Sequence, residues 1–173
     1  ATSIGAYAFY NCSALTSLNG TGEINIPETV ESIGTYAFAE CKAITKVSIG
    51  SGTETIEANA FQNCSLLNTL ILSEGIKTIG NWAFDGDISL LTLNVPSTIT
   101  SIGISSFRGN SSLTSVHMAD QSALTIINPY AFQSCSSLTE FIFDGGTSLT
   151  TISEGAFLDC SLLTKWGSDV SST

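Results

Sequence analysis

Apolar residues recur at fixed spacing along the chain. A phenylalanine anchors each copy of the pattern, and the steps between successive anchors are 29, 23, 23, 23, 25 and 25 residues. The seven anchors are Phe9, Phe38, Phe61, Phe84, Phe107, Phe132 and Phe157. An Ile lies five residues before every anchor, apolar residues lie six and nine after it, and Ser and Thr fill much of the rest. Self-similarity at this period is the signature of a repeat architecture.

Each copy predicts two short strands joined by turns. In the third copy, Leu70 and Leu72 alternate with Thr69 and Ile71. A period of two predicts a strand with the leucines inward and the other two side chains outward. A further apolar column predicts a second short strand, as in "TITSIG" at 98–103.

Between the strands, "IGxxAFxxC" places Ala and Cys four residues apart with Phe between them, which predicts about one helical or 3-10 turn packed inward. Gly5, Gly34, Gly80 and Gly103 precede this turn. We expect them to mark a corner where a positive φ has no steric cost.

One such coil buries too little apolar surface to fold alone. About five large apolar side chains contribute about 10 kcal/mol, which is less than the cost of ordering a whole coil. Stacked coils cover one another, so the pattern predicts one cooperative solenoid of seven coils of 23–25 residues. We expect a single domain over residues 1–173, with an inserted loop at 19–24 and no polar cap at either end. We therefore interpret it as an excerpt of a longer chain.

The columns "SIGxxAFxxCxxLTxLxLP" resemble the BspA-like leucine-rich repeats of surface and secreted proteins. The resemblance implies a leucine-rich-repeat-type right-handed superhelix used for adhesion or protein binding. It supplies no catalytic residues, cofactor or metal ligands. The chain departs from the commoner leucine-rich repeat because its cysteine column precedes the strand.

Composition narrows the partners. Fifteen acidic and five basic residues give a net charge of −10, which argues against nucleic acid, since nucleic-acid binding needs a basic stripe. No apolar run approaches the roughly 18 residues that span a bilayer, so we expect no membrane insertion of this segment. The acidity favours a secreted or surface protein, with an acidic docking face as the alternative.

The five cysteines share one inward column. Their odd number and the lack of a CxxC pair favour a packed ladder of thiols over disulfides, although neighbours such as Cys41 and Cys64 lie within bridging reach. Asp87 and Asn110 replace cysteine in two copies. An inward Asp87 needs a polar partner, so we expect a local irregularity in the fourth coil.

Other tempting residues carry no recognisable chemistry. His117 is the only histidine, and no nucleophile or metal motif accompanies it. Of the Asn-x-Ser/Thr sequons at Asn11, Asn19, Asn63 and Asn110, only Asn19 lies in the inserted loop, and it is the candidate glycosylation site.

Outward residues of the stacked strands are the candidate protein-binding face. One row comprises Lys46, Thr69, Thr92, Ser115, Glu140 and Lys165, and a second comprises Ser48, Ile71, Asn94, His117 and Ile142. Ile71 and Ile142 are expected to be isolated exposed side chains. Aromatic residues two before the anchors form either core packing or a recognition stripe, and these are Tyr7, Tyr36, Trp82 and Tyr130.

Three functions fit these features. The first is a non-enzymatic extracellular or cell-surface scaffold for protein binding or adhesion, with surface or extracellular proteins as partners. The second is a structural spacer or polymer subunit of a surface layer or filament, with end-to-end self-association. A carbohydrate-binding or enzymatic segment is the third, and no residue pattern favours it.

Overall fold

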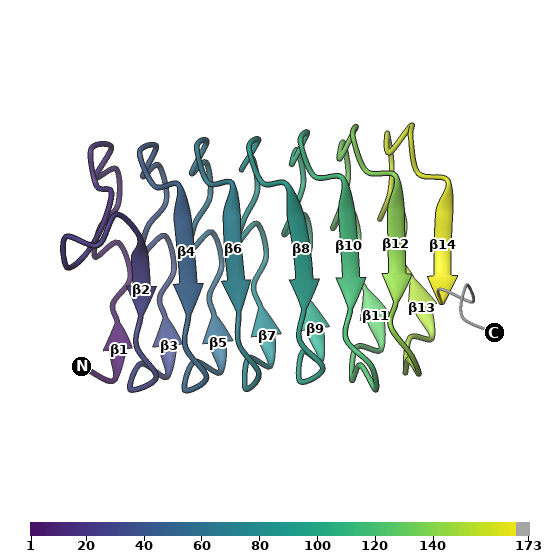
Figure 1. Ribbon diagram of the computed structural model, residues 1–173, viewed down its shortest axis with the longest axis horizontal. Helices are drawn as coiled ribbons and strands as arrows, with labels where there is room; N and C mark the ends of the chain where they lie inside the picture. Colours follow the sequence, from purple (N-terminus) through teal and green to yellow (C-terminus); the bar gives the residue numbers. More distant parts are fainter. Residues whose placement is uncertain (169–173) are drawn as a thin grey trace.

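The computed structural model describes residues 1–168 and shows a parallel β-solenoid (Figure 1). Long and short strands alternate along the chain. The short strands are β1 (Ser3–Ile4), β3 (Ser32–Ile33), β5 (Thr55–Ile56), β7 (Thr78–Ile79), β9 (Ser101–Ile102), β11 (Ile126–Ile127) and β13 (Thr151–Ile152). The long strands are β2 (Ile24–Ile26), β4 (Lys46–Ile49), β6 (Thr69–Leu72), β8 (Thr92–Val95), β10 (Ser115–Met118), β12 (Glu140–Phe143) and β14 (Lys165–Ser168).

The short strands form one continuous seven-stranded sheet, whereas the long strands form two sheets. One contains β2, β4 and β6, and the other contains β8, β10, β12 and β14. All pairs within these sheets are parallel and in register, so Val47 faces Leu70 and Val116 faces Phe141. The period-two prediction is confirmed, because Leu93 and Val95 are buried while Thr92 and Asn94 are exposed.

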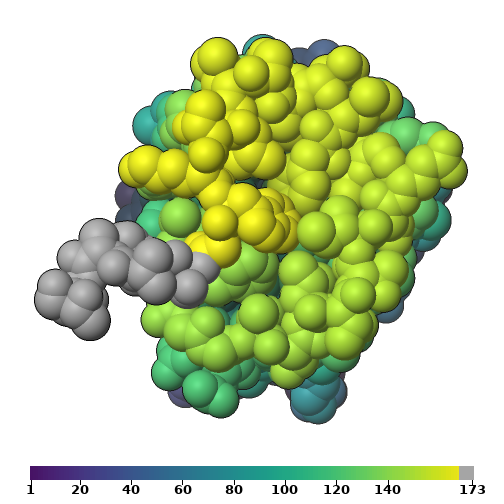
Figure 2. Space-filling view, turned by 90° about the vertical axis from the view of Figure 1, so that its right-hand side faces the viewer, coloured from purple at the N-terminus to yellow at the C-terminus, as the bar shows by residue number. Residues whose placement is uncertain are grey.

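The core is a set of side-chain ladders that run along the solenoid axis. The anchor rings stack almost parallel, as in Phe61 and Phe84, whose centroids lie 5.3 Å apart at an interplanar angle of 1°. The Ile column of the short strands packs in the same core as the anchor rings. Figure 2 shows the solenoid from its C-terminal end. Each coil thus covers its neighbour's apolar residues, as the repeat predicted.

The expected helical or 3-10 turn is wrong, because the described residues contain no helix. The segment instead makes successive turns, in which Ala37 donates its N–H to Gly34 and Phe38 donates to Ala60 of the next coil. Tyr36 and Glu40 have φ values of 55° and 63°, and a left-handed residue every four positions prevents a continuous helix. Alternate N–H groups therefore bond between coils.

The expected seven coils are also corrected. Strands β1 to β13 bound six complete turns, since the described part of the seventh copy supplies β14 but no further short strand. The handedness of the superhelix stays a prediction.

The corner glycines have a different role from the expected one. Positive φ falls on Tyr36 and Trp82, and on their equivalents, not on Gly34 or Gly80. A Cβ at Gly80 would lie 2.6 Å from the backbone N of Ala58 in the preceding coil. Glycine is present here because two backbones approach closely.

Candidate protein-binding face

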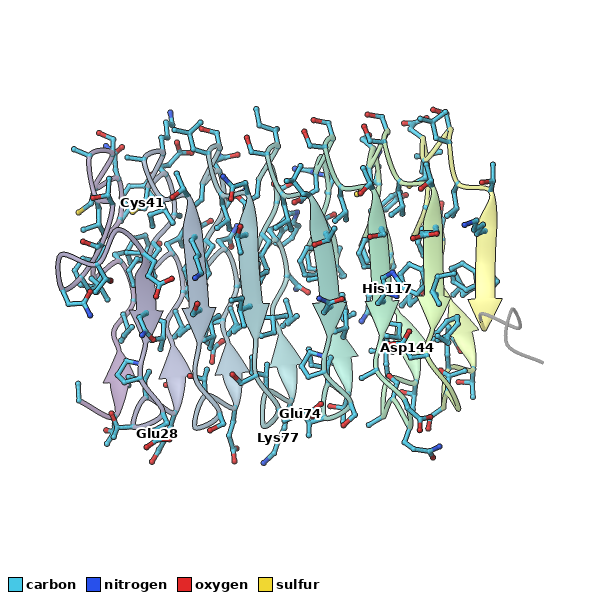
Figure 3. The ribbon with its side chains drawn as sticks, viewed as in Figure 1. Glu28, Cys41, Glu74, Lys77, His117 and Asp144 are labelled. Carbon is cyan, nitrogen blue, oxygen red and sulfur yellow. The ribbon has the colours of Figure 1, made fainter. Side chains whose placement is uncertain are left out.

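The registers of the long strands place the candidate residues in two rows, and His117 of the second row is labelled in Figure 3. Ser115 pairs with Thr92 and Glu140, and Glu140 pairs with Lys165. His117 lies in register with Asn94 and Ile142 in the second row. We call this surface the strand face. Its predicted rows exist within each of the two long-strand sheets.

Ion pairs occupy the lysines of the strand face. Lys46 Nζ lies 2.7 Å from Glu23 Oε2, and Lys165 Nζ lies 3.1 Å from Glu140 Oε2. These groups are partly exposed, so each pair adds little to stability. The ion pairs affect recognition of a partner more than they affect stability, because both lysines already have a carboxylate neighbour.

His117 lies between two carboxylates of the next strand. Its Nε2 is 3.7 Å from Glu140 Oε1, and its Nδ1 is 3.4 Å from Asp144 Oδ1. Glu140, Ile142 and Asp144 point to the same side of the strand. The imidazole of His117 contacts the two carboxylates and therefore lies over Ile142, which is between them. The expectation of an exposed Ile142 is therefore wrong: it is 8% exposed, whereas Ile71 is 46% exposed.

The strand face is interrupted between β6 and β8 (Figure 1). After β4, β6, β10 and β12 the next residue donates its N–H to the preceding coil, as Ser73 does to Ile49 and Ala119 does to Val95. Pro96 occupies this position after β8. Proline has no N–H to donate, so the carbonyl of Leu72 receives no such bond and the two sheets separate here.

A hollow of about 260 Å³ extends from this interruption across the ends of β8 and β10 to Asp144, which follows β12. Leu72, Val95 and Pro96 contribute apolar surface to it. The polar residues that line it are Glu74, Asn94, His117 and Asp144. Ser97 and Thr98 donate backbone N–H groups to Glu74, and these bonds lower the pKa of its carboxyl group. Glu74 and Asp144 lie on opposite sides of β8 and β10 (Figure 3).

Exposed apolar residues gather in the two coils beside the interruption. Leu66, Ile88 and Leu91 are each about half exposed. Leu66 recurs as the exposed Leu162, whereas other coils place small or polar residues at the positions of Ile88 and Leu91, so that Thr45, Thr114 and Thr139 correspond to Leu91. The fold does not need leucine there. This exposed apolar group was not predicted from the sequence, although its departure from the repeat pattern could have identified it.

The aromatic column does not form a continuous stripe. Tyr7 stacks on Tyr36 with centroids 5.1 Å apart, but Asn59 and Ser105 separate Tyr36, Trp82 and Tyr130 from one another. These three rings are half-buried, and all have positive φ. Tyr36, Trp82 and Tyr130 thus each lie on the turn of their own coil and do not form a row of adjacent rings.

The cysteine column is a hydrogen-bonded ladder in which the five cysteines are free thiols. Cys64 Sγ lies 3.3 Å from the carbonyl oxygen of Phe38 in the preceding coil, and Asn110 Nδ2 donates at 2.8 Å to Phe84. Burial raises the pKa of the Cys41 thiol to about 11. Cys41, Cys64 and Cys135 are buried, as the interpretation of an inward ladder predicted, whereas Cys12 in the first coil is exposed.

Asp87 is the unusual member of this ladder. It is fully buried and its Oδ1 accepts a bond from the backbone N–H of Cys64 at 2.8 Å. No hydrogen-bond partner reaches its Oδ2 within the described part of the chain. Burial raises the pKa of this carboxyl group well above its usual range. The predicted polar partner of Asp87 is thus a backbone amide.

Two further hollows lie away from the strand face. One of about 360 Å³ is lined near the C-terminal end by Phe143, Ile152 and Trp166. Another of about 670 Å³ lies among turns that carry Glu28, Glu31 and Glu54. Over residues 1–168, no three His, Cys, Asp or Glu side chains are grouped as metal ligands. In the same range, no helix is long and apolar enough to cross a bilayer.

The sequons differ in accessibility. Asn110 is buried, and Asn63 donates to Glu40 Oε1. Asn19 is exposed in the inserted loop, where its Oδ1 accepts a bond from Thr21. Its glycosylation stays a prediction, as does end-to-end self-association.

These features define a leucine-rich-repeat β-solenoid with an open strand face. Residues 2–123 and 54–166 match the family described as BspA type Leucine rich repeat region (6 copies). The chain belongs to this family. No curated protein matches it.

Solved structures share the fold. The Treponema pallidum leucine-rich repeat protein is 24% identical, with a TM-score of 0.83 over 94% of this chain and 72% of its own. The pneumococcal vaccine antigen PcpA is 18% identical, with a TM-score of 0.73 over 84% of this chain and 36% of its own. A Eubacterium ventriosum leucine-rich repeat protein is 24% identical, with a TM-score of 0.66 over 87% and 44%. The chain thus spans less than half of the last two.

Proposed function

We propose that this chain is a non-enzymatic scaffold, secreted or held at the cell surface, that binds other proteins through its strand face. The main support is the regular array of outward side chains on the long strands, which the core does not use. Repeat scaffolds of this family are typical of protein–protein interaction. An extended array of this kind offers many adjacent contacts to a partner.

Two further observations support binding over catalysis. Four residues of the strand face are Ser or Thr, and its two lysines have carboxylate neighbours. Its single histidine contacts two carboxylates and no nucleophile among the described residues. The net charge of −10 favours a partner with a basic surface.

A matched pair of surface variants tests the proposal. The chain is presented to immobilised extracellular-matrix proteins as wild type, as Thr92→Arg with Ser115→Arg on the strand face, and as Thr125→Arg with Thr150→Arg elsewhere. Thr125 and Thr150 are exposed outside the long strands, so the second pair adds the same charge on another surface. We expect a binder that the first variant loses and the second retains.

Equal loss in both variants, or no binder at all, would contradict the proposal. The surface location has its own test, which is labelling of intact producing cells with an antibody to the chain. Labelling only after permeabilisation would contradict it.

A further inference from the structure

We propose that the hollow at the break between β6 and β8 receives an arginine or lysine side chain of a protein partner. The inference rests on the proposed function and names the chemistry that part of the strand face recognises. The long-strand ladder is regular except at Pro96. Pro96 removes the N–H that would close the ladder onto Leu72, and the hollow lies where that bond is missing.

The size of the hollow limits its occupant. Its volume of about 260 Å³ is below the roughly 300–1,000 Å³ of small-molecule pockets. It suits a side chain better than a cofactor. Leu72, Val95 and Pro96 offer an apolar floor to the aliphatic stem of a long side chain.

The polar lining specifies the charge of the occupant. Glu74 and Asp144 are carboxylates, Asn94 adds an amide, and His117 adds an imidazole whose Nδ1 lies 3.4 Å from Asp144 Oδ1. No lysine or arginine lines the hollow, and the lysines of the strand face lie beside Glu23 and Glu140. The pKa of Glu74 is lowered by its bonds from Ser97 and Thr98, which keeps that carboxylate ionised. A guanidinium or ammonium head matches this set of acceptors.

The apolar surroundings extend the contact. Ile71 and Leu91 are both about half exposed in the coils on either side of the break. They depart from the hydroxyl and amide residues of neighbouring coils. Neither residue lines the hollow. A partner segment that continues from the hollow along β6 and β8 would also cover them, and such apolar contacts surround a charged contact with surface that excludes water.

An NMR titration tests the inference on the whole chain. The probe is N-acetyl-arginine amide, and the neutral control is its citrulline counterpart, which has nearly the same shape. We expect saturable shifts at the Asn94 side-chain amide, Val95 and His117 with the arginine probe, and no saturable shift with citrulline. Glu74→Gln with Asp144→Asn should weaken binding by about tenfold or more.

A charge-matched variant is the control for general acidity. Glu31→Gln with Glu57→Gln removes two exposed carboxylates from other coils and should leave binding unchanged. Pro96→Ser restores a backbone N–H, so we expect it to narrow the hollow and weaken the shifts. The fold of each variant is checked from its amide spectrum.

Three outcomes would overturn the inference: no shift at these residues, equal binding of citrulline, or equal weakening in the Glu31/Glu57 variant. If the titration fails while Thr92→Arg with Ser115→Arg still abolishes binding to a matrix protein, the strand face binds by other chemistry. If the titration succeeds but no matrix protein binds the wild-type chain, the proposed function is contradicted and the arginine site stands.

Discussion

At the scale of single residues, the interior of this solenoid uses one rule repeatedly. A side chain three residues after each anchor donates a hydrogen bond to the anchor's carbonyl in the preceding coil. Cys41 does so to Phe9, Cys135 to Phe107 and Asn110 to Phe84. Asp87 interrupts this rule, since its Oδ1 accepts a bond from the Cys64 N–H and its Oδ2 has no hydrogen-bond partner among the described residues. The molecule therefore has one buried acid at a position built for a donor.

We expect Asp87→Asn to stabilise the fold near neutral pH by about 1–3 kcal/mol. An asparagine can keep the acceptor for Cys64 and donate to Phe61, as Asn110 donates to Phe84. Because burial raises the pKa of Asp87 in the folded state, the unfolded chain binds fewer protons there and stability falls as pH rises. The loss begins above the pKa of an unfolded aspartate and continues through the raised one. Chemical unfolding at several pH values would measure it.

The reverse substitution is the control. Asn110→Asp places a second carboxyl group in the same column, where Asn110 Nδ2 now donates to Phe84 and Phe107. It should destabilise the chain by about 3 kcal/mol or more at neutral pH and less in acid. If both variants have the same pH slope as the wild type, the buried carboxyl group does not control stability.

The glycine column gives a second prediction at this scale. Gly80→Ala should cost about 1–3 kcal/mol, because its Cβ would overlap the backbone of Ala58 and overpacking strains the fold. Gly5→Ala is the matched control, since nothing lies within 4 Å of its Cβ position. Thermal unfolding of the two variants would compare them. Equal losses would mean that glycine acts through backbone entropy and not through close approach.

At the scale of elements, the sequence predicted what depends on periodicity. The alternation in "TLIL" gave β6, and the Ile column gave the short strands. Periodicity could not predict the turns, because φ at Tyr36 or Trp82 is set by bonds to the next coil and not by residue type. Nor could it predict the break after β6. The inward residues Leu70 and Leu93 are regular there, and the signal was Pro96 in a column of N–H donors.

Restoring that donor should join the two long-strand sheets. In Pro96→Ser the new N–H can donate to Leu72, as Ser73 donates to Ile49. We expect the amide of residue 96 to be protected from hydrogen exchange, as a ladder amide is. Net stability should change by less than about 1 kcal/mol, since the gained bond offsets the greater freedom of the unfolded chain. Rapid exchange at residue 96 would show that another constraint holds β6 and β8 apart.

At the scale of the whole molecule, the proposed function depends on the contrast between regular and irregular coils. The core columns continue through all coils, so the scaffold tolerates the break between β6 and β8 without losing its stacked rings. The same coil pair carries Asp87, Pro96 and the exposed Ile71 and Leu91. The buried Asp87 is expected to lower stability and the exposed Ile71 and Leu91 to lower solubility, and the proposed binding through the strand face offers a reason for the exposed pair. A scaffold selected for stability alone would resemble its other coils.

Removing the irregular coil tests this contrast. Deletion of residues 81–103 joins Gly80 to Ile104, which preserves the register because Gly103 and Gly80 share one column. Ala119 would then follow the strand next to β6, and its N–H could donate to Leu72 as it now does to Val95. We expect a continuous long-strand sheet, loss of the arginine-dependent shifts and a flatter pH profile without Asp87. Exchange protection and unfolding by denaturant would measure these effects.

Deletion of residues 58–80 is the matched control, because it also removes 23 residues in register and joins Glu57 to Asn81. That shorter chain keeps Asp87 and Pro96 and places β8 next to β4. In the wild type the carbonyl of Ile49 accepts a bond from Ser73, and the carbonyl of Leu72 lacks a donor. In this shorter chain the carbonyl of Ile49 would be the one without a donor. The 81–103 deletion should therefore be the more stable of the two, although both lose one coil of core. If the two chains unfold at the same denaturant concentration with the same pH slope, the fourth coil does not lower the stability of the chain, and no binding function is needed to explain it.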